Sequence, residues 1–277
     1  MKAILLSLLV IHVISPLLAQ GPLTPPGAPA PTMKTLDQIE PRIPISSLPY
    51  TISTSGSYYF TGNLVFSDVG GDAITISASN VTLDLMGYTL SSTAGVTGAA
   101  IFSTAASGIT IRNGKIKGTT TVTITGSFPS RTWTPVAGGF TSGIYDLSKQ
   151  GIYEELQING CRENGLYVDN DFGSIVRQVT ASSNGVFGIN ASYGSVTNST
   201  AASNGIYGIF AYYGSVTNST TTSNGGSGIV ASYGSVTNST TTSNTGIDLV
   251  AENAVVAFCR YGSGTTTGST LTGNLTP

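Results

Sequence analysis

Acidic and basic side chains gather in one stretch of the sequence, between positions 146 and 177. The chain has 11 basic and 13 acidic residues, and nine of them lie in this stretch. Asp169 and Asp171 are two residues apart, so in a strand they project from the same face. Such an acidic pair can bind Ca²⁺ together with other oxygen ligands, although a solvated charged face produces the same pattern. Asp169 and Asp171 are the candidate calcium ligands, and the sequence predicts no other cofactor.

A second candidate for ligand contact is the segment 127–139, which contains the sole tryptophan, Trp133, close to Arg131. Prolines and the loss of alternation predict a long loop that leaves the regular structure. An exposed tryptophan beside an arginine suits a carbohydrate, whereas a tryptophan that folds back onto the protein has a structural role. The substrate-binding residues predicted here are Trp133, Arg131 and Asp146.

The elements that position these residues are written in a repeat of twenty residues. The sequence Gly-Ser-Val-Thr-Asn-Ser-Thr recurs unchanged at Gly194, Gly214 and Gly234. Its residue types favour strands and turns over helix, and twenty residues is too short for a helical-hairpin repeat. Each repeat is therefore predicted to form one coil of a β-solenoid.

Asparagines mark the same point in each coil. Stacked about 4.8 Å apart, their amides can hydrogen-bond from one coil to the next. The predicted ladder consists of Asn164, Asn184, Asn204, Asn224 and Asn244. A second column of asparagines consists of the first residues of Asn-Ser-Thr glycosylation sequons. A turn at this point of each coil explains the repeated asparagine equally well. This second column consists of Asn198, Asn218 and Asn238.

Alternation identifies the inward face of each coil. Ile189 and Ala191 alternate with Gly188 and Asn190, and the pattern recurs in the following repeats, so the aliphatic residues are predicted to form the core. The tyrosines at 193, 213 and 233, with Phe172 one coil earlier, predict an aromatic stack at a bend. Further upstream, Ile109-Thr-Ile-Arg repeats Val81-Thr-Leu-Asp, which predicts Arg112 beside Asp84 on neighbouring coils.

The N-terminal segment indicates export. Residues 1–19 have a basic start at Lys2, an apolar run and a small residue at Ala19, as in a secretory signal peptide, and they contain the only histidine, His12. We then expect a proline-rich linker at 20–32, an N-terminal cap at 33–49 with a short helix from Met33 to Ile39, the solenoid at 50–262 and a Gly/Thr-rich tail at 263–277. The predicted location is secreted or cell-surface, extracellular or periplasmic, in a bacterium.

Composition narrows the classes of partner. The formal net charge is −2 and no basic cluster is present, which argues against nucleic acid and against an anionic membrane surface after signal cleavage. Hydrophobic residues make up 40% of the chain, enough to fill a narrow continuous core. Cys161 and Cys259 lie about five coils apart and are predicted to be buried, unpaired thiols. The sequence makes no prediction of oligomeric state.

Several motifs resemble one known superfamily. Val81-Thr-Leu-Asp-Leu-Met-Gly-Tyr-Thr-Leu, Ile109-Thr-Ile-Arg-Asn-Gly-Lys-Ile and the Val-Thr-Asn-Ser-Thr coils resemble the right-handed parallel β-helix proteins of the pectin-lyase-like superfamily. The leader from Gly21 resembles exported, mostly uncharacterised bacterial members. The resemblance implies an all-β fold, a single-stranded right-handed parallel β-helix of roughly ten coils with a short N-terminal helical cap.

The resemblance leaves the activity open, because this fold hosts lyases, hydrolases, epimerases, tailspikes and non-catalytic adhesins. The polygalacturonase pattern is missing, since the sequence has no Asp-Asp, no Arg-x-Lys and no histidine after His12. A lyase acting on a uronate polymer would need acids that hold Ca²⁺ and an Arg or Lys base near the substrate α-proton. The residues that could supply this chemistry are Arg177, Arg162, Lys149, Glu154 and Glu155.

The repeats favour a different function. Catalysis needs unlike residues that meet once, whereas the coils in 191–250 present the same outward residues several times. We therefore predict a secreted, non-catalytic structural or surface-interaction module, for which polysaccharide along the coil face is the candidate ligand. The alternative is a lyase or hydrolase acting on an acidic glycan, and a minor alternative is an ice-binding array formed by hydroxyls such as Ser195 and Thr197.

Overall fold

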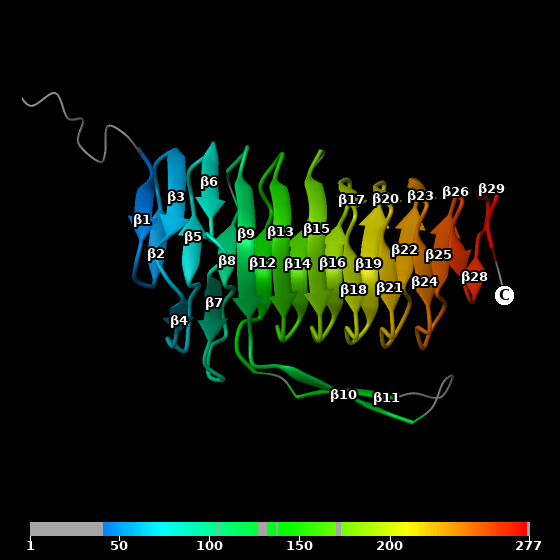
Figure 1. Cartoon of the computed structure of the whole chain (residues 1–277), viewed down its shortest axis with the longest axis horizontal. Helices are drawn as coiled ribbons and strands as arrows, with labels where there is room; N and C mark the ends of the chain where they lie inside the picture. Colours follow the sequence, from blue (N-terminus) through cyan, green and yellow to red (C-terminus); the bar gives the residue numbers. More distant parts are fainter. Residues whose placement is uncertain (1–40, 105, 127–131, 137, 170–172, 276–277) are drawn as a thin grey trace, which may run out of the picture. The chain divides into compact units, whose positions relative to one another are not determined.

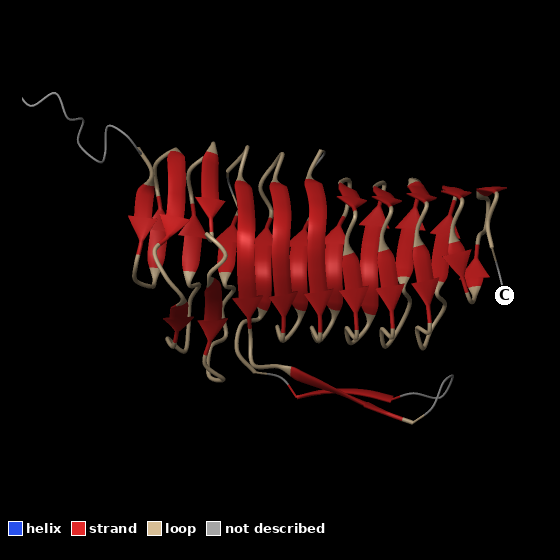
Figure 2. Cartoon of the chain, in the orientation of Figure 1, coloured by secondary structure: helices blue, strands red, loops and turns tan. Residues whose placement is uncertain are grey.

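The computed structural model describes residues 41–275 except 105, 127–131, 137 and 170–172. This part of the chain consists of strands and turns, with no helix (Figures 1 and 2). The predicted signal peptide, proline-rich linker and helix at 33–39 lie outside the described residues. No helix in the described part is long and apolar enough to cross a membrane.

The strands form two large parallel sheets, because each strand pairs with its counterpart in the next coil (Figure 1). The sheet of 17 strands contains β1 (Ile43–Ile45), β3 (Gly56–Phe60), β4 (Leu64–Phe66), β6 (Val81–Asp84), β7 (Thr89–Ser92), β9 (Thr110–Lys117), β13 (Ile152–Asn159), β15 (Ile175–Ser182), β17 (Ser195–Thr197), β18 (Thr200–Ala202), β20 (Ser215–Thr217), β21 (Thr220–Thr222), β23 (Ser235–Thr237), β24 (Thr240–Thr242), β26 (Val255–Ala257), β27 (Arg260–Tyr261) and β29 (Thr270–Thr272). We call it the long sheet.

A second sheet of ten strands takes one strand from each coil, in agreement with the roughly ten coils predicted. It contains β2 (Tyr50–Ile52), β5 (Ile74–Ile76), β8 (Ile101–Ser103), β12 (Ser142–Asp146), β14 (Asn164–Val168), β16 (Phe187–Ala191), β19 (Tyr207–Tyr212), β22 (Ile229–Ser232), β25 (Leu249–Glu252) and β28 (Gly264–Thr265). Strand pairing thus begins at Ile43 and continues to Thr272, beyond both ends of the segment 50–262.

Aliphatic side chains from both sheets fill the space between them. In the twenty-residue coils, Ile189 pairs with Ile209, and Ile209 with Ile229, and all three are fully buried. Val196, Val216 and Val236 form an equivalent column in the long sheet. The predicted inward columns are confirmed at these positions. Two polar residues of the opposite parity differ: Asn190 is 5% exposed, and Asp248, whose carboxylate accepts from Asn244, is 2% exposed.

The corners between strands carry residues with positive φ. Asn198, Asn218 and Asn238 have φ between 48° and 50°, a conformation that Asn tolerates better than most residues. The column is exposed, and its turn position accounts for the repeated Asn without glycosylation. The same corner holds Glu155 and Gln178 in the irregular coils, also with positive φ. The corner that Asn occupies in the twenty-residue coils is thus occupied by Glu or Gln in the irregular coils.

The asparagine ladder is present from Asn184 to Asn244. The side-chain oxygens of Asn204, Asn224 and Asn244 each accept from both the backbone N–H and the Nδ2 of the Asn one coil earlier, at 2.8–3.1 Å. Asn164 is not part of the ladder, which corrects the prediction. The coil before Asn184 aligns Asn159 with Ser182, so the ladder position falls to Cys161, whose N–H donates to Asn184 Oδ1 at 3.0 Å.

Asn164 instead opens β14, where it pairs in register with Ser142. Its Nδ2 donates to Ser142 Oγ at 3.3 Å, and its Oδ1 is buried without a hydrogen-bond partner.

Both cysteines are buried and unpaired, as predicted. Cys259 lies twenty residues beyond Ser239, at the end of a column of buried serines in which Ser199 N donates to Ser219 Oγ and Ser219 N to Ser239 Oγ.

The segment predicted to leave the coil does so as an antiparallel ribbon. β10 (Thr121–Thr125) pairs only with β11 (Thr132–Val136), which places Ile124 opposite Trp133. The base of the ribbon is closed by Thr120, whose Oγ1 donates to Gly138 O at 2.8 Å and accepts from Gly138 N at 3.0 Å. The ribbon extends along one side of the stacked coils in Figure 1.

Candidate functional site

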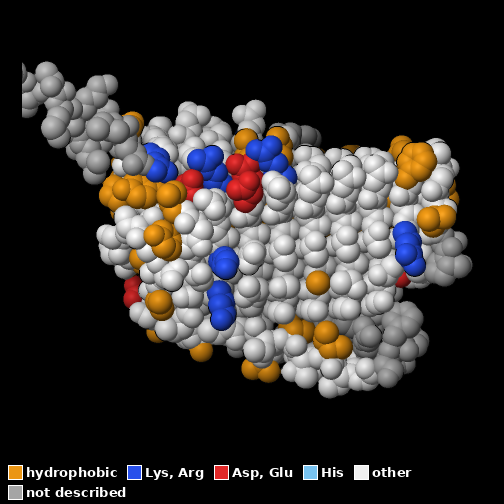
Figure 3. Space-filling model, in the orientation of Figure 1, with side chains coloured by type: hydrophobic (Ala, Val, Ile, Leu, Met, Phe, Trp, Pro, Cys, Tyr) orange, Lys and Arg blue, Asp and Glu red, His pale blue; other side chains and the backbone are white. Residues whose placement is uncertain are grey.

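Unlike side chains meet on the outer face of the long sheet, over β6, β9, β13 and β15. Four consecutive strands place Asp84, Arg112, Glu154 and Arg177 in one register column. Figure 3 shows acidic and basic side chains grouped along one edge of this face, while most of the remaining face carries neither charged nor hydrophobic groups. We call these four residues the charged column.

The charged column consists of two ion pairs. Arg177 Nε donates to Glu154 Oε2 at 2.6 Å, and Arg177 Nη2 contacts the same oxygen. Arg112 Nε donates to Asp84 Oδ2 at 3.1 Å, as the sequence predicted. Asp84 is 5% exposed, and its Oδ1 also accepts from Met86 N at 2.8 Å and Asn113 Nδ2 at 3.1 Å. Asp84 is therefore bound by the protein itself through both oxygens.

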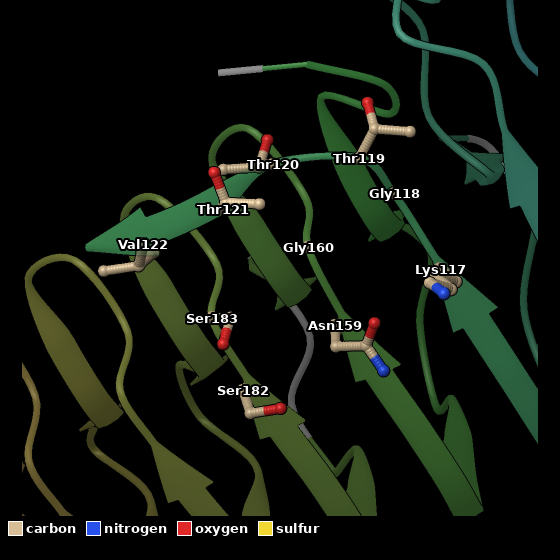
Figure 4. Close-up of a pocket in the computed structure, with 10 residues that line it drawn as sticks. All are labelled: Lys117, Gly118, Thr119, Thr120, Thr121, Val122, Asn159, Gly160, Ser182 and Ser183. Atoms are coloured by element: carbon tan, nitrogen blue, oxygen red, sulfur yellow. The ribbon is translucent and has the colours of Figure 1, made fainter. Parts of the chain in front are cut away.

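A groove lies at the C-terminal ends of β9, β13 and β15, where the ribbon leaves the coil (Figure 4). Its volume is about 500 Å³. Lys117, Asn159 and Ser182 occupy one register column on three successive strands, so the groove runs along the stack for about 10 Å. It is lined by Lys117, Gly118, Thr119, Thr120, Thr121, Val122, Asn159, Gly160, Ser182 and Ser183.

The polar groups of this groove are available to a ligand. Among the described residues, none forms an ion pair with Lys117 and none hydrogen-bonds to the side chain of Lys117 or Asn159. Lys117 is exposed, and Asn159 and Ser182 are half-buried. The groove thus presents an ammonium, an amide and several hydroxyls, and its lining also includes the apolar side chain of Val122.

The predicted catalytic residues do not form one cluster. Glu154 and Arg177 are paired in the charged column, whereas Glu155 lies exposed at a corner with φ of 55°. Arg162 follows β13 in the turn that leads to the second sheet, where its N–H donates to Phe140 O. Lys149 lies in the loop before β13, paired with Ser107. The structure brings together only one acid and one base of this set.

Asp146 is buried rather than placed on a binding surface. It is 1% exposed at the end of β12. Its Oδ2 accepts from the hydroxyl of Tyr153, itself fully buried, at 2.6 Å, and its Oδ1 accepts from Ser148 N at 2.7 Å. These bonds give Asp146 a role inside the coil, away from the groove and from the charged column.

The predicted calcium ligands are described only in part. Asp169 Oδ2 accepts from the hydroxyl of Tyr167 at 3.0 Å, while Asp171 lies outside the described residues. Burial raises the pKa of Tyr167 to about 12, and the hydrogen bond and negative charge of Asp169 act in the same direction. Within the described part of the chain, no group of three or more His, Cys, Asp and Glu could hold a metal ion.

Trp133 belongs to β11 of the ribbon, and Arg131 and Phe172 lie outside the described residues. The tyrosine stack is present: Tyr193 and Tyr213 have ring centroids 5.3 Å apart and Tyr213 and Tyr233 4.9 Å apart, with interplanar angles of 7° and 17°. Rings stacked in this way cover one another's faces, and a sugar ring needs a free face to stack on. The faces between these rings are therefore closed to a sugar, which favours a structural role for the stack, while Tyr213 and Tyr233 remain 48% and 47% exposed.

Sequence reasoning missed the groove. Lys117 and Ser183 are far apart in the chain and share no motif, and only the register of three coils brings them together. One signal was present: in Ile109–Lys117 the aliphatic residues point inward, so alternation sends Lys115 and Lys117 outward beside Ile116. Neither lysine has an acidic neighbour in register, since Lys115 pairs with Gln157 and Lys117 with Asn159.

Comparison with known proteins identifies the architecture. Residues 136–260 match the family model described as "Right handed beta helix region". The described part of the chain has the fold of a right-handed parallel β-helix. A comparison with curated protein sequences gave no match.

Solved structures resemble this β-helix in fold at low sequence identity. The A-module of the mannuronan C-5 epimerase AlgE6 of Azotobacter vinelandii has a TM-score of 0.60 and 15% identity over 79% of this chain and 67% of its own length. ORF18 of Geobacillus virus E2 has a TM-score of 0.56 and 10% identity, covering 84% and 54%. The Dettilon tailspike protein has a TM-score of 0.54 and 12% identity, covering 84% and 59%. This chain thus spans just over half of the length of the last two proteins.

Proposed function

We propose that this β-helix is a secreted or cell-surface, non-catalytic interaction module that binds polysaccharide in the groove beside the ribbon. The observation that carries the proposal is the set of unpartnered polar groups on Lys117 and Asn159 in a groove of about 500 Å³. Concave sites with a few converging polar groups are the usual form of small-ligand sites. Sugars present many hydroxyls. The amide of Asn159 and the hydroxyl of Ser182 can each donate hydrogen bonds to these hydroxyls and accept hydrogen bonds from them.

The shape of the groove supports a polymer rather than a compact ligand. It runs along the stack over three strands, about 10 Å, and lies beside the outer face of the long sheet, most of which carries neither charged nor hydrophobic groups (Figure 3). That face repeats Thr200, Thr220 and Thr240 in one register column, so each coil offers a similar hydroxyl. The mannuronan C-5 epimerase named above shares the fold and is named for a polysaccharide, which agrees with this ligand class.

The arrangement of acids and bases favours binding over catalysis. A general base must be within hydrogen-bond reach of a substrate proton. The guanidinium of Arg177 is held by Glu154, the carboxylate of Asp84 is bound by three donors, and neither pair lines the groove. Lys117 is the one titratable residue that lines it, and a single ammonium without an acidic partner suits the binding of an oxygen-rich ligand.

The test is a glycan-array screen of the secreted chain, followed by calorimetry on polysaccharides that bind. We expect Lys117→Gln and Asn159→Ala each to weaken binding at least about tenfold, since each removes a hydrogen-bonding group from the site. Lys115→Gln is the matched control, because it removes the same charge from the same strand outside the groove. Its affinity should match that of the wild type.

Three outcomes would overturn parts of the proposal. No polysaccharide bound at all would remove the function. Equal losses in the Lys117→Gln and Lys115→Gln variants would remove the groove as the site. New reducing ends or unsaturated products formed from a bound polysaccharide would show that the protein is a hydrolase or lyase rather than a non-catalytic module.

A further inference from the structure

The ribbon formed by β10 and β11 has unpaired edges. Within the described residues, no backbone hydrogen bond joins either strand to any strand except its partner in the ribbon. Thr121, Thr123, Ile124 and Thr125 of β10 are exposed. A two-stranded ribbon is only marginally stable by itself in water, and three or more strands are usually needed. The ribbon is therefore incomplete as a sheet.

Strand β10 lacks the features that keep exposed edges from pairing. Natural edge strands carry charged residues, bulges or prolines that block a further strand. The segment 118–126 has no charged residue and no proline, and its strand Thr-Val-Thr-Ile-Thr consists of residues with high β propensity. By these criteria β10 is a strand that accepts another strand.

The two edges of the ribbon are not equivalent. β11 contains Pro135, which has no N–H, and a proline fits such a strand only where its nitrogen faces away from the partner strand. The outer edge of β11 therefore lacks a donor. Pro135 pairs with Val122, so Val122, and with it Ile124, direct their N–H and C=O groups away from β11. The open edge of the ribbon is β10.

We propose that β10 pairs with β10 of a second copy of this chain, antiparallel and about a two-fold axis, to form a four-stranded sheet. A two-fold contact brings a residue near the axis against its own copy, so any charge there would face a like charge. Such a contact therefore requires an uncharged edge strand, and β10 has no charged residue. The contact buries the outward N–H and C=O groups of Val122 and Ile124 in mutual hydrogen bonds, with no other partner needed.

The test measures the mass of the full secreted chain in solution by sedimentation across a range of concentrations. We expect a dimer for the wild type and a monomer for Thr123→Lys, which sets two ammonium groups against each other at the contact. Thr134→Lys is the matched control, because Thr134 pairs with Thr123 across the ribbon but lies on β11, away from the open edge. This control should stay dimeric.

Two further variants separate loss of pairing from loss of folding. Val122→Pro removes an outward N–H that the ribbon does not use, and we expect a monomer with an unchanged far-ultraviolet circular dichroism spectrum. Mixing Thr123→Lys with Thr123→Glu should restore the dimer by bringing opposite charges together. A wild type that is monomeric at every concentration, or equal dissociation by Thr123→Lys and Thr134→Lys, would overturn the proposal.

Discussion

Asn244 donates through its backbone N–H and its side-chain Nδ2 to the same oxygen of Asp248, at 3.0 and 2.8 Å. The asparagine ladder therefore ends on a carboxylate. Each amide in the ladder donates toward the C-terminal end, so the last acceptor receives a chain of aligned donors. A buried anion suits this place because hydrogen bonds to a charged acceptor are stronger than neutral ones.

The first prediction concerns this last acceptor. Asp248 is 2% exposed, and its second oxygen accepts from Ser263 N at 3.0 Å. In Asp248→Asn the new amide would face that N–H donor to donor. We expect the free energy of unfolding to fall by about 2–3 kcal/mol, measured by urea denaturation. Glu252→Gln, an exposed carboxylate four residues later, should change it by less than about 0.5 kcal/mol.

The second prediction concerns close packing beside the ladder. A Cβ added at Gly208 would lie 2.6 Å from Gly228 O and 2.7 Å from Asn224 Nδ2. Both atoms are held by the coil, so Gly208→Ala should lower the free energy of unfolding by about 1–3 kcal/mol. At Gly62 an added Cβ meets nothing within 4 Å. Thermal denaturation should show a lower midpoint for Gly208→Ala and no loss for Gly62→Ala; equal midpoints would contradict the proposed packing.

The sequence was most informative where coils have equal length. With a constant spacing of twenty residues, the ladder from Asn184 to Asn244 and the aliphatic columns follow directly from the period. Asn164 was misplaced because the preceding coil pairs Asn159 with Ser182, an offset of 23 residues that no local signal announces. An Asn-Gly pair at 164 imitated the repeat, while the residue that takes the ladder position is a cysteine.

The site was less predictable than the fold for the same reason. The link between Glu154 and Arg177 depends on the offset of 23 residues in this irregular coil, and the pairing of Lys117 with Asn159 in the groove depends on an offset of 42 residues that includes the ribbon. The ribbon was predicted as a loop because its prolines and aromatics interrupt the alternation of the coil. The alternating Thr-Val-Thr-Ile-Thr at 121–125 was the signal for a strand there.

The third prediction compares the two ion pairs of the charged column. The side chain of Arg177 is 53% exposed, so its pair with Glu154 is screened by solvent. A double-mutant cycle with Glu154→Gln and Arg177→Gln should give a coupling energy under about 1 kcal/mol that shrinks with added salt. Asp84→Asn should cost more, about 1.5–3 kcal/mol, because Asp84 is buried and accepts three hydrogen bonds. A coupling energy between Glu154 and Arg177 that exceeds the cost of Asp84→Asn would contradict this comparison of the two ion pairs.

The fourth prediction follows from the buried thiol of Cys161. Burial raises its pKa from 9.0 to about 12, partly offset by a hydrogen bond to the backbone of Gly118. Above pH 9 the thiol ionises in the unfolded chain while the folded protein still holds the proton. The unfolded state then binds fewer protons, so the free energy of unfolding falls as pH rises from 9 toward 12.

Urea denaturation at several pH values in this window measures the effect. Tyrosines titrate in the same range, so Cys161→Ala is the control, and its unfolding free energy should fall less steeply with pH than that of the wild type. Because the thiolate is the reactive form, Cys161 in the folded protein should also resist alkylation at pH 8 and react once the chain is unfolded. Alkylation of Cys161 in the folded protein as fast as in the unfolded chain would contradict its place at the buried end of the ladder.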